Sequence, residues 1–127
     1  MKTIYQISNL ALQDDTFTAS ITFNPSHPVF GGHFPGQPVV PGVVLFEIAA
    51  AATSQAAEKR FIVREVSIIK FLQLVDPTVN TVIMLEGSII KEEPGKYSAD
   101  LILRNGETIF SKIKGLKLDT LSDEQRI

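Results

Sequence analysis

GGHFPGQPVVPGVVLFEIAAAA, residues 31–52, joins a proline-rich loop to an almost wholly apolar segment. Five prolines fall within residues 24–42, a density that excludes regular structure and indicates a long, stiff loop. A helix should begin near Pro41 and Gly42, because proline suits the first helical turn, and its alanines favour helix to about residue 58. The first ten helical positions are apolar all round except Glu47, so we expect this helix to be buried in the core.

The segments on either side of this helix read as strands. Residues 3–8 are a weak strand candidate, whereas residues 17–25 are a stronger one with Phe17, Ala19, Ile21 and Phe23 on one face. After the helix, β-type segments separated by turn signals occupy residues 61–72, 79–91, 96–104 and 107–118. The dipeptide Asn105-Gly106 suits a two-residue hairpin turn, so the last strands should form a meander.

One helix that is apolar all round cannot be buried by one face of a flat sheet. We therefore expect an α+β fold, in which a curved antiparallel β-sheet wraps around one long central helix and a second copy closes the open side. The chain has 127 residues, which fits one domain over residues 1–118 followed by a polar tail over residues 119–127.

Composition excludes several classes of function. A net charge of −2 argues against a general nucleic-acid-binding surface. The absence of cysteine removes disulfides, thiolate metal sites and cysteine nucleophiles, and the two histidines, His27 and His33, lack helical metal-ligand spacing, so we expect no metal. The N-terminus does not resemble a secretory signal and no apolar run is long enough to span a bilayer, so we expect a cytoplasmic protein with no membrane span.

Three residues of the opening stretch could carry chemistry. A carboxylate in an apolar helix must be paired, hydrogen-bonded, protonated or open to a wet cavity, although Glu47 could also reach solvent along the helix surface. His33 could simply bond a backbone carbonyl in its loop. If His33 and Glu47 converge, they form an acid–base pair, and the N–H of Gly42 at the helix start could hold a developing negative oxygen. This set suggests proton abstraction next to a carbonyl with loss of a leaving group, but it does not identify the substrate.

The same residues resemble the active-site segment of the 3-hydroxyacyl-[acyl-carrier-protein] dehydratases, the FabZ/FabA-like family. The family pattern G-H-F-P-x-x-P-[IV]-x-P-G-V-L-x-x-E is matched in register by Gly32, His33, Phe34, Pro35, Pro38, Val39, Pro41, Gly42, Val43 and Glu47. Lys70-Phe71 and residues 75–77 resemble a later family region, so the resemblance covers roughly residues 17–90. A glycine before the histidine and a glutamate in the acid position are typical of the FabZ branch.

The resemblance implies the hotdog fold and a dimer with its sites at the interface, where His33 of one subunit faces Glu47 of the other. It implies dehydration of a 3-hydroxyacyl thioester to the trans-2-enoyl thioester. His33 would take the C2 proton, Glu47 would protonate the departing hydroxyl, and the Gly42 N–H would hold the thioester carbonyl. Phe34, Pro41 and Val43 would line the substrate site. No cofactor is implied, because the substrate arrives on the phosphopantetheine of an acyl carrier protein.

Partners and pathway are less constrained. Arg60, Arg64 and Lys70 are candidates for docking the carrier protein. The chain lacks the N-terminal segment typical of FabZ and has VDPTVN in place of the family's V-x-P-G-D, which places it among short, divergent members in fatty-acid or aryl-polyene biosynthesis. A homodimer, a heterodimer with a related hotdog subunit and a higher oligomer stay open. The alternatives are a hotdog acyl thioesterase, or a non-catalytic partner subunit or acyl-binding module.

Overall fold

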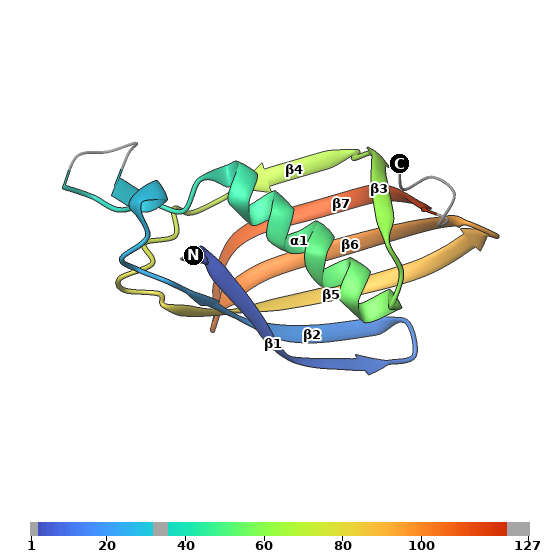
Figure 1. Cartoon of the computed structure of the whole chain (residues 1–127), viewed down its shortest axis with the longest axis horizontal. Helices are drawn as coiled ribbons and strands as arrows, with labels where there is room; N and C mark the ends of the chain where they lie inside the picture. Colours follow the sequence, from blue (N-terminus) through green and yellow to red (C-terminus); the bar gives the residue numbers. More distant parts are fainter. Residues whose placement is uncertain (1–2, 32–35, 122–127) are drawn as a thin grey trace.

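One helix lies across an antiparallel sheet in the computed structural model, which describes residues 3–31 and 36–121 (Figure 1). The strands are β1 (Tyr5–Gln13), β2 (Thr16–Phe23), β3 (Phe61–Glu65), β4 (Ile68–Phe71), β5 (Val82–Glu93), β6 (Lys96–Asn105) and β7 (Thr108–Thr120). Their order is β1-β2-β5-β6-β7-β3, with β4 also paired to β7. The predicted α+β class, with a sheet wrapped around one helix, is confirmed.

Helix α1 (Gly42–Ala57) begins and ends where the sequence predicts. It ends at Glu58, which adopts the left-handed conformation (φ 53°) and donates its N–H to the carbonyl oxygen of Gln55. One face of the helix packs on the sheet. Its buried residues follow the helical period: Val44, Leu45, Ile48, Ala49, Ala52, Thr53 and Ala56.

The described residues leave the opposite face of α1 uncovered. Val43 is 74% exposed and Glu47 is exposed, while Ala50 and Ser54 are partly exposed, and we call these four residues the uncovered face. In the described residues the sheet contacts only one side of the helix. The uncovered face is the side that the sequence predicts a second copy to close.

The N-terminal strands form a longer hairpin than the sequence indicates. Phe17, Ala19, Ile21 and Phe23 all point into the core, as predicted. Strand β1 extends beyond the weak candidate at residues 3–8, through a register shift between Ser8 and Ala11. A short turn with a positive φ of 55° at Asp14 then leads into β2.

The strands after the helix form the predicted meander, with two differences. Residues 61–72 do not make one strand but two, because the chain breaks at Ser67, opposite the left-handed residue Gly115 (φ 65°) of β7. The predicted turn at Asn105-Gly106 is wrong by one residue, because Asn105 pairs with Thr108 and the central residues of the β6–β7 hairpin are Gly106 and Glu107. Strand β7 reaches Thr120, and residues 122–127 of the predicted tail lie outside the described residues.

Candidate active site

Packing and a hydrogen bond hold the described parts of the loop before the helix, on both sides of residues 32–35. Residues Pro28–Gly31 form a 3-10 turn in which the buried Phe30 packs edge-to-face on Phe23, with ring centroids 6.0 Å apart. The N–H of Val39 donates to the carbonyl oxygen of Phe30 at 3.3 Å, which brings the two ends of the segment together. His33 and Phe34 lie outside the described residues, so their roles stay predictions.

A cavity of about 420 Å³ lies at the start of α1. It is lined by Val39, Val40, Pro41, Gly42, Leu45, Phe71, Gln73, Leu74 and Val75, and we call it the helix-start cavity. The N–H of Val40 donates to the carbonyl oxygen of Val75 at 2.9 Å, which holds the loop against the opposite wall. Most of the lining is apolar, so the cavity can accept a hydrocarbon group beside the polar N–H groups of the first helical turn.

Gly42 has a packing role that the sequence does not reveal. A Cβ atom on Gly42 would lie 2.8 Å from Cζ of Phe71, closer than non-bonded atoms approach. The sequence suggests that a glycine here lets a ligand reach the backbone. In the structure, the Phe71 ring occupies the space in which a side chain at residue 42 would lie, so packing also favours glycine here.

Glu47 is paired across 42 residues of sequence with Tyr5 of β1. The Tyr5 hydroxyl donates to Oε1 of Glu47 at 3.2 Å. Partial burial, the negative charge of Glu47 and this hydrogen bond, in that order, raise the pKa of Tyr5 to about 12. Of the alternatives that the sequence leaves open for Glu47, the single chain shows a hydrogen-bonded and exposed carboxylate on the uncovered face.

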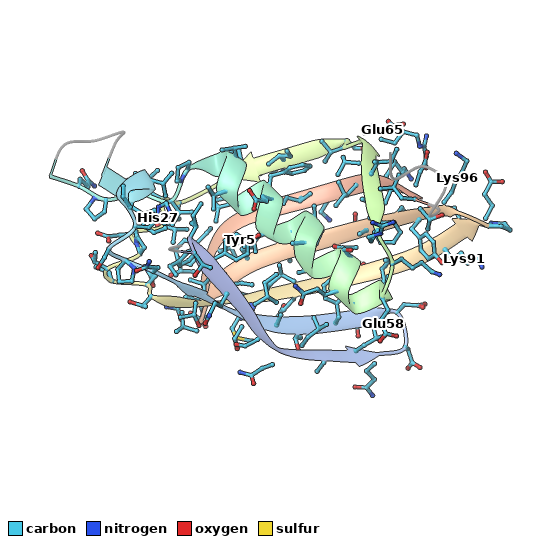
Figure 2. All side chains as sticks on the ribbon, viewed as in Figure 1. Tyr5, His27, Glu58, Glu65, Lys91 and Lys96 are labelled. Atoms are coloured by element: carbon cyan, nitrogen blue, oxygen red, sulfur yellow. The ribbon has the colours of Figure 1, made fainter. Side chains whose placement is uncertain are left out.

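The chain brings some of the predicted site residues together and separates others. Pro41 and Gly42 both line the helix-start cavity, whereas Val43 points away from it and is exposed. Glu47 does not line this cavity but faces β1, as the position of Tyr5 beside α1 indicates (Figure 2). Within one chain, the carboxylate and the cavity therefore lie on different sides of the helix.

The predicted docking cations do not form one patch. Lys70 precedes Phe71 on β4 and so adjoins a residue that lines the helix-start cavity, but it does not line the cavity itself, because neighbouring side chains of a strand point to opposite faces. Arg64 lies on β3 beyond the other end of α1, where its Nε donates to Asp119 at 3.1 Å. Arg60 also follows the end of the helix, and its carbonyl oxygen accepts the N–H of Leu121. Of the three cations, only Lys70 adjoins a residue that lines the cavity.

The remaining histidine has a structural role in its turn. The N–H of Val29 donates to Nδ1 of His27 at 3.1 Å, and the imidazole lies against Phe30. Over residues 3–31 and 36–121, no three His, Asp or Glu side chains are close enough to hold a metal ion. In the same part of the chain, no helix is both long and apolar enough to cross a membrane.

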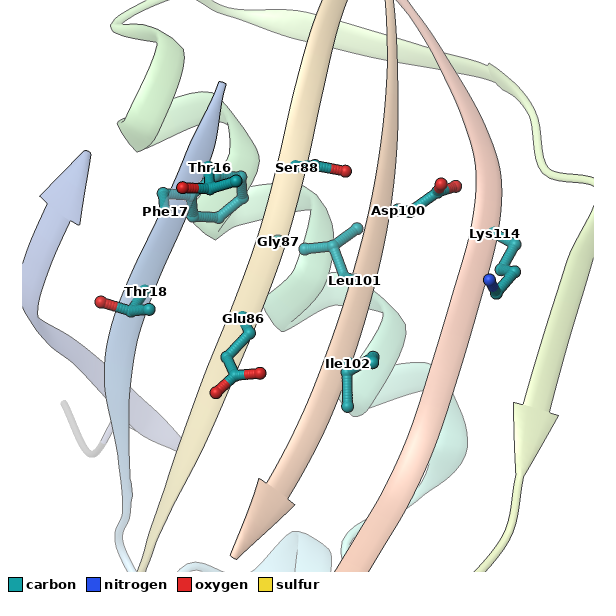
Figure 3. A pocket seen from close by; sticks show the side chains of 10 residues that line it. All are labelled: Thr16, Phe17, Thr18, Glu86, Gly87, Ser88, Asp100, Leu101, Ile102 and Lys114. Atoms are coloured by element: carbon teal, nitrogen blue, oxygen red, sulfur yellow. The ribbon is translucent and has the colours of Figure 1, made fainter. Parts of the chain in front are cut away.

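A second hollow lies on the face of the sheet that points away from the helix (Figure 3). Its volume is about 350 Å³, and both polar and apolar residues line it, with Thr18, Glu86, Asp100 and Lys114 among the polar ones. None of the predicted site residues contributes to it. The helix-start cavity is therefore the better candidate for the site.

Comparison with known proteins identifies relatives. The family model ApeI-like, described as ApeI dehydratase, matches residues 9–112. A thioester dehydrase of Halalkalibacterium halodurans is 31% identical over 108 residues, which are 85% of this chain and 56% of that protein. The chain therefore spans little more than half the length of this relative.

Solved structures share the fold at low sequence identity. The dehydratase heterocomplex ApeI:P from Xenorhabdus doucetiae aligns with a TM-score of 0.64 and 18% identity, over 96% of this chain and 100% of that chain. A hypothetical thioesterase of Streptococcus pneumoniae with coenzyme A also gives a TM-score of 0.64, with 10% identity over 93% of this chain and 86% of that one. The hotdog fold predicted from the resemblance is confirmed, and both activities occur among its structural neighbours.

Proposed function

Because the chain belongs to the ApeI-like dehydratase family, we propose that it dehydrates a 3-hydroxyacyl thioester, carried by an acyl carrier protein, to the trans-2-enoyl thioester. One observation carries the proposal beyond the family match. A single helix presents its N-terminus to an apolar cavity at Gly42 and, five residues further on, exposes a carboxylate at Glu47. The N–H at the helix start can hold the oxygen of a thioester carbonyl, and the carboxyl group can protonate a leaving hydroxyl.

The proposed reaction breaks two bonds of the substrate. The imidazole of His33 takes the proton from C2, and negative charge develops on the thioester oxygen, where the N–H of Gly42 stabilises it. The C3–O bond then breaks, and Glu47 supplies the proton with which the hydroxyl leaves as water. Transfer of a proton from His33 to Glu47 through water restores the enzyme. No metal or cofactor takes part in the proposed steps.

A complete site of this kind needs two chains. Glu47 and the helix-start cavity lie on different sides of α1, and apart from the Tyr5 contact to Glu47 the described residues leave the uncovered face open. We propose that a second copy covers this face and that Glu47 of each copy completes the site of the other. Each chain has its own His33 and Glu47, so two identical copies form two complete sites. The related heterocomplex makes pairing with a different hotdog subunit the alternative.

Carrier-protein docking is proposed at Lys70, since this cation lies near the helix-start cavity. An acidic carrier protein would be attracted there electrostatically. Lys70→Glu should raise KM for the carrier-bound substrate more than for a small thioester analogue. Arg64→Glu is the matched charge reversal, because Arg64 lies at the other end of the helix and pairs with Asp119. Equal effects of the two substitutions, or equal effects on both substrates, would argue against docking at Lys70.

The test is a product analysis. The protein is incubated with 3-hydroxyacyl carrier proteins of several chain lengths, and mass spectrometry follows the loss of water from the acyl group. We expect the enoyl thioester from the wild type, and losses of at least about a hundredfold in His33→Ala and Glu47→Gln. Circular dichroism checks that both variants are folded.

Other products would point to the competing functions. Release of free acid would favour a thioesterase, in which water attacks the carbonyl. No turnover at any chain length, alone or with a related subunit, would identify a non-catalytic module. Unchanged rates in both variants would remove His33 and Glu47 from the mechanism.

A further inference from the structure

The N-terminal strand adds an unexpected group to the proposed site. Tyr5 lies on β1, an edge strand, and its hydroxyl donates to Oε1 of Glu47 at 3.2 Å. Among the described residues, Tyr5 is the only hydrogen-bond partner of the Glu47 side chain. Oε2 therefore remains for a substrate hydroxyl or a water molecule.

Backbone pairing and packing hold Tyr5 in a position from which its hydroxyl can orient the Glu47 side chain. Tyr5 is paired with Phe23 of β2, and its partly buried ring packs against the hydrophobic core. The neighbouring carbonyl of Ile4 accepts the N–H of Asn24, which ties the start of β1 to the end of β2. Glu47, by contrast, is an exposed glutamate on a helix surface, where a side chain without a partner samples several rotamers.

Building on the proposed function, we propose that Tyr5 is a positioning residue that orients Glu47 for proton transfer to the departing hydroxyl. As Glu47 gives up its proton from Oε2, negative charge spreads over both carboxylate oxygens. The hydrogen bond from Tyr5 to Oε1 strengthens at that moment, because bonds to a charged acceptor are stronger than bonds to a neutral one. The phenol thus favours the transition state over the bound substrate, which raises kcat rather than affinity.

The phenol can perform this role over the whole neutral range. Burial and the charge of Glu47 raise the pKa of Tyr5 to about 12, so the hydroxyl stays protonated and remains a donor. Tyr5 does not contact the proposed reacting atoms. Its effect passes through Glu47, which distinguishes it from a catalytic acid.

The kinetic test uses the two tyrosines of the chain as a matched pair. Tyr5→Phe keeps the ring and removes the donor, and we expect kcat to fall about tenfold with KM within about twofold of the wild-type value. A hydrogen bond to a charged group contributes about 1.5–3 kcal/mol, and the lower end applies because water can replace the phenol at an exposed carboxylate. Tyr97→Phe is the control, since Tyr97 packs on Phe61 and should leave kcat unchanged.

A double variant separates positioning from a general structural effect. In a Glu47→Gln background, Tyr5→Phe should lower kcat no further, because the carboxylate that it orients is gone. An equal tenfold loss in both backgrounds, or a wild-type kcat in Tyr5→Phe alone, would overturn the proposal. Thermal unfolding of each variant verifies that the fold is retained.

A spectroscopic measurement tests the contact independently of turnover. In a Tyr97→Phe background Tyr5 is the sole tyrosine, and tyrosinate absorbance reports its titration above about pH 9, with circular dichroism confirming the native fold at each pH. Glu47→Gln should move the midpoint to lower pH, because the negative charge is removed while burial remains. An unchanged midpoint would overturn the proposed contact. A shifted midpoint in a protein that dehydrates no thioester would instead refute the proposed function, and the positioning role with it.

Discussion

The contact between Gly42 and Phe71 should couple the effects of substitutions at these two residues on stability. A Cβ on residue 42 would lie 2.8, 3.1 and 3.3 Å from three atoms of the Phe71 ring. Ordinary contacts begin near 3.4 Å, so Gly42→Ala must push the ring by roughly half an ångström or more. Overpacking of this kind costs about 1–3 kcal/mol, and the lower end applies because Phe71 is 55% exposed and can move.

Alanine also has an intrinsic advantage over glycine at this position. It restricts the unfolded chain, which is worth about 0.4–1 kcal/mol where the native backbone tolerates it. Gly42→Ala alone should therefore change the free energy of unfolding by little, from about zero to 1 kcal/mol of destabilisation. In a Phe71→Ala background the clash is absent, and the same substitution should stabilise the protein by about 0.5 kcal/mol.

The assay is a double-mutant cycle measured by urea unfolding at one fixed protein concentration. The structure predicts a coupling free energy between Gly42→Ala and Phe71→Ala of about 1 kcal/mol. A coupling below about 0.3 kcal/mol would show that the ring does not lie against the helix start in solution. The glycine would then be explained by ligand access alone, as the sequence suggests.

Further predictions concern stability and assembly. Ile48→Ala should lower the free energy of unfolding by about 3 kcal/mol, because Ile48 is fully buried. Val43→Ala on the uncovered face should act chiefly on dimerisation, which would change the dependence of Tm on protein concentration. Stability should fall as pH rises from 10 toward about 12, since the unfolded state loses the Tyr5 proton first, and Tyr5→Phe should show a smaller fall in urea titrations over that range. Gly115→Ala should destabilise by about 2 kcal/mol or more, because residue 115 has a positive φ and an added Cβ would overlap the Ser67 side chain; an unchanged unfolding midpoint would contradict this.

Local sequence signals predict some elements better than others. The bounds of α1 follow from Pro41, Gly42 and the alanine run, which act within the segment itself. Strand β1 is only partly predicted, since it is an edge strand whose second half is exposed and lacks an apolar alternation. The break at Ser67 is set by Gly115 on a partner strand, so residues 61–72 alone cannot predict it.

In the candidate site, too, some features follow from local sequence and others depend on distant parts of the chain. The helix start alone predicts a role for the N–H of Gly42, and the family resemblance adds Pro41 to the same part of the site. It cannot predict the contact between Tyr5 and Glu47, which depends on how β1 lies along the helix. An all-round apolar helix also does not reveal whether its second face is covered by its own chain or by another. Glu47 is exposed in the single chain, which is one of the alternatives that the sequence leaves open for a carboxylate in this helix.

The central claim is that His33 of one copy and Glu47 of another form each site, and complementation tests it most directly. His33→Ala and Glu47→Gln proteins, each inactive alone, are unfolded together, refolded and assayed for dehydration of a 3-hydroxyacyl carrier protein. Random pairing places both substitutions in one site of each mixed dimer and leaves the other site intact, so we predict recovery of about a quarter of wild-type activity. No recovery from a mixture shown to contain mixed dimers would contradict a site shared between two copies.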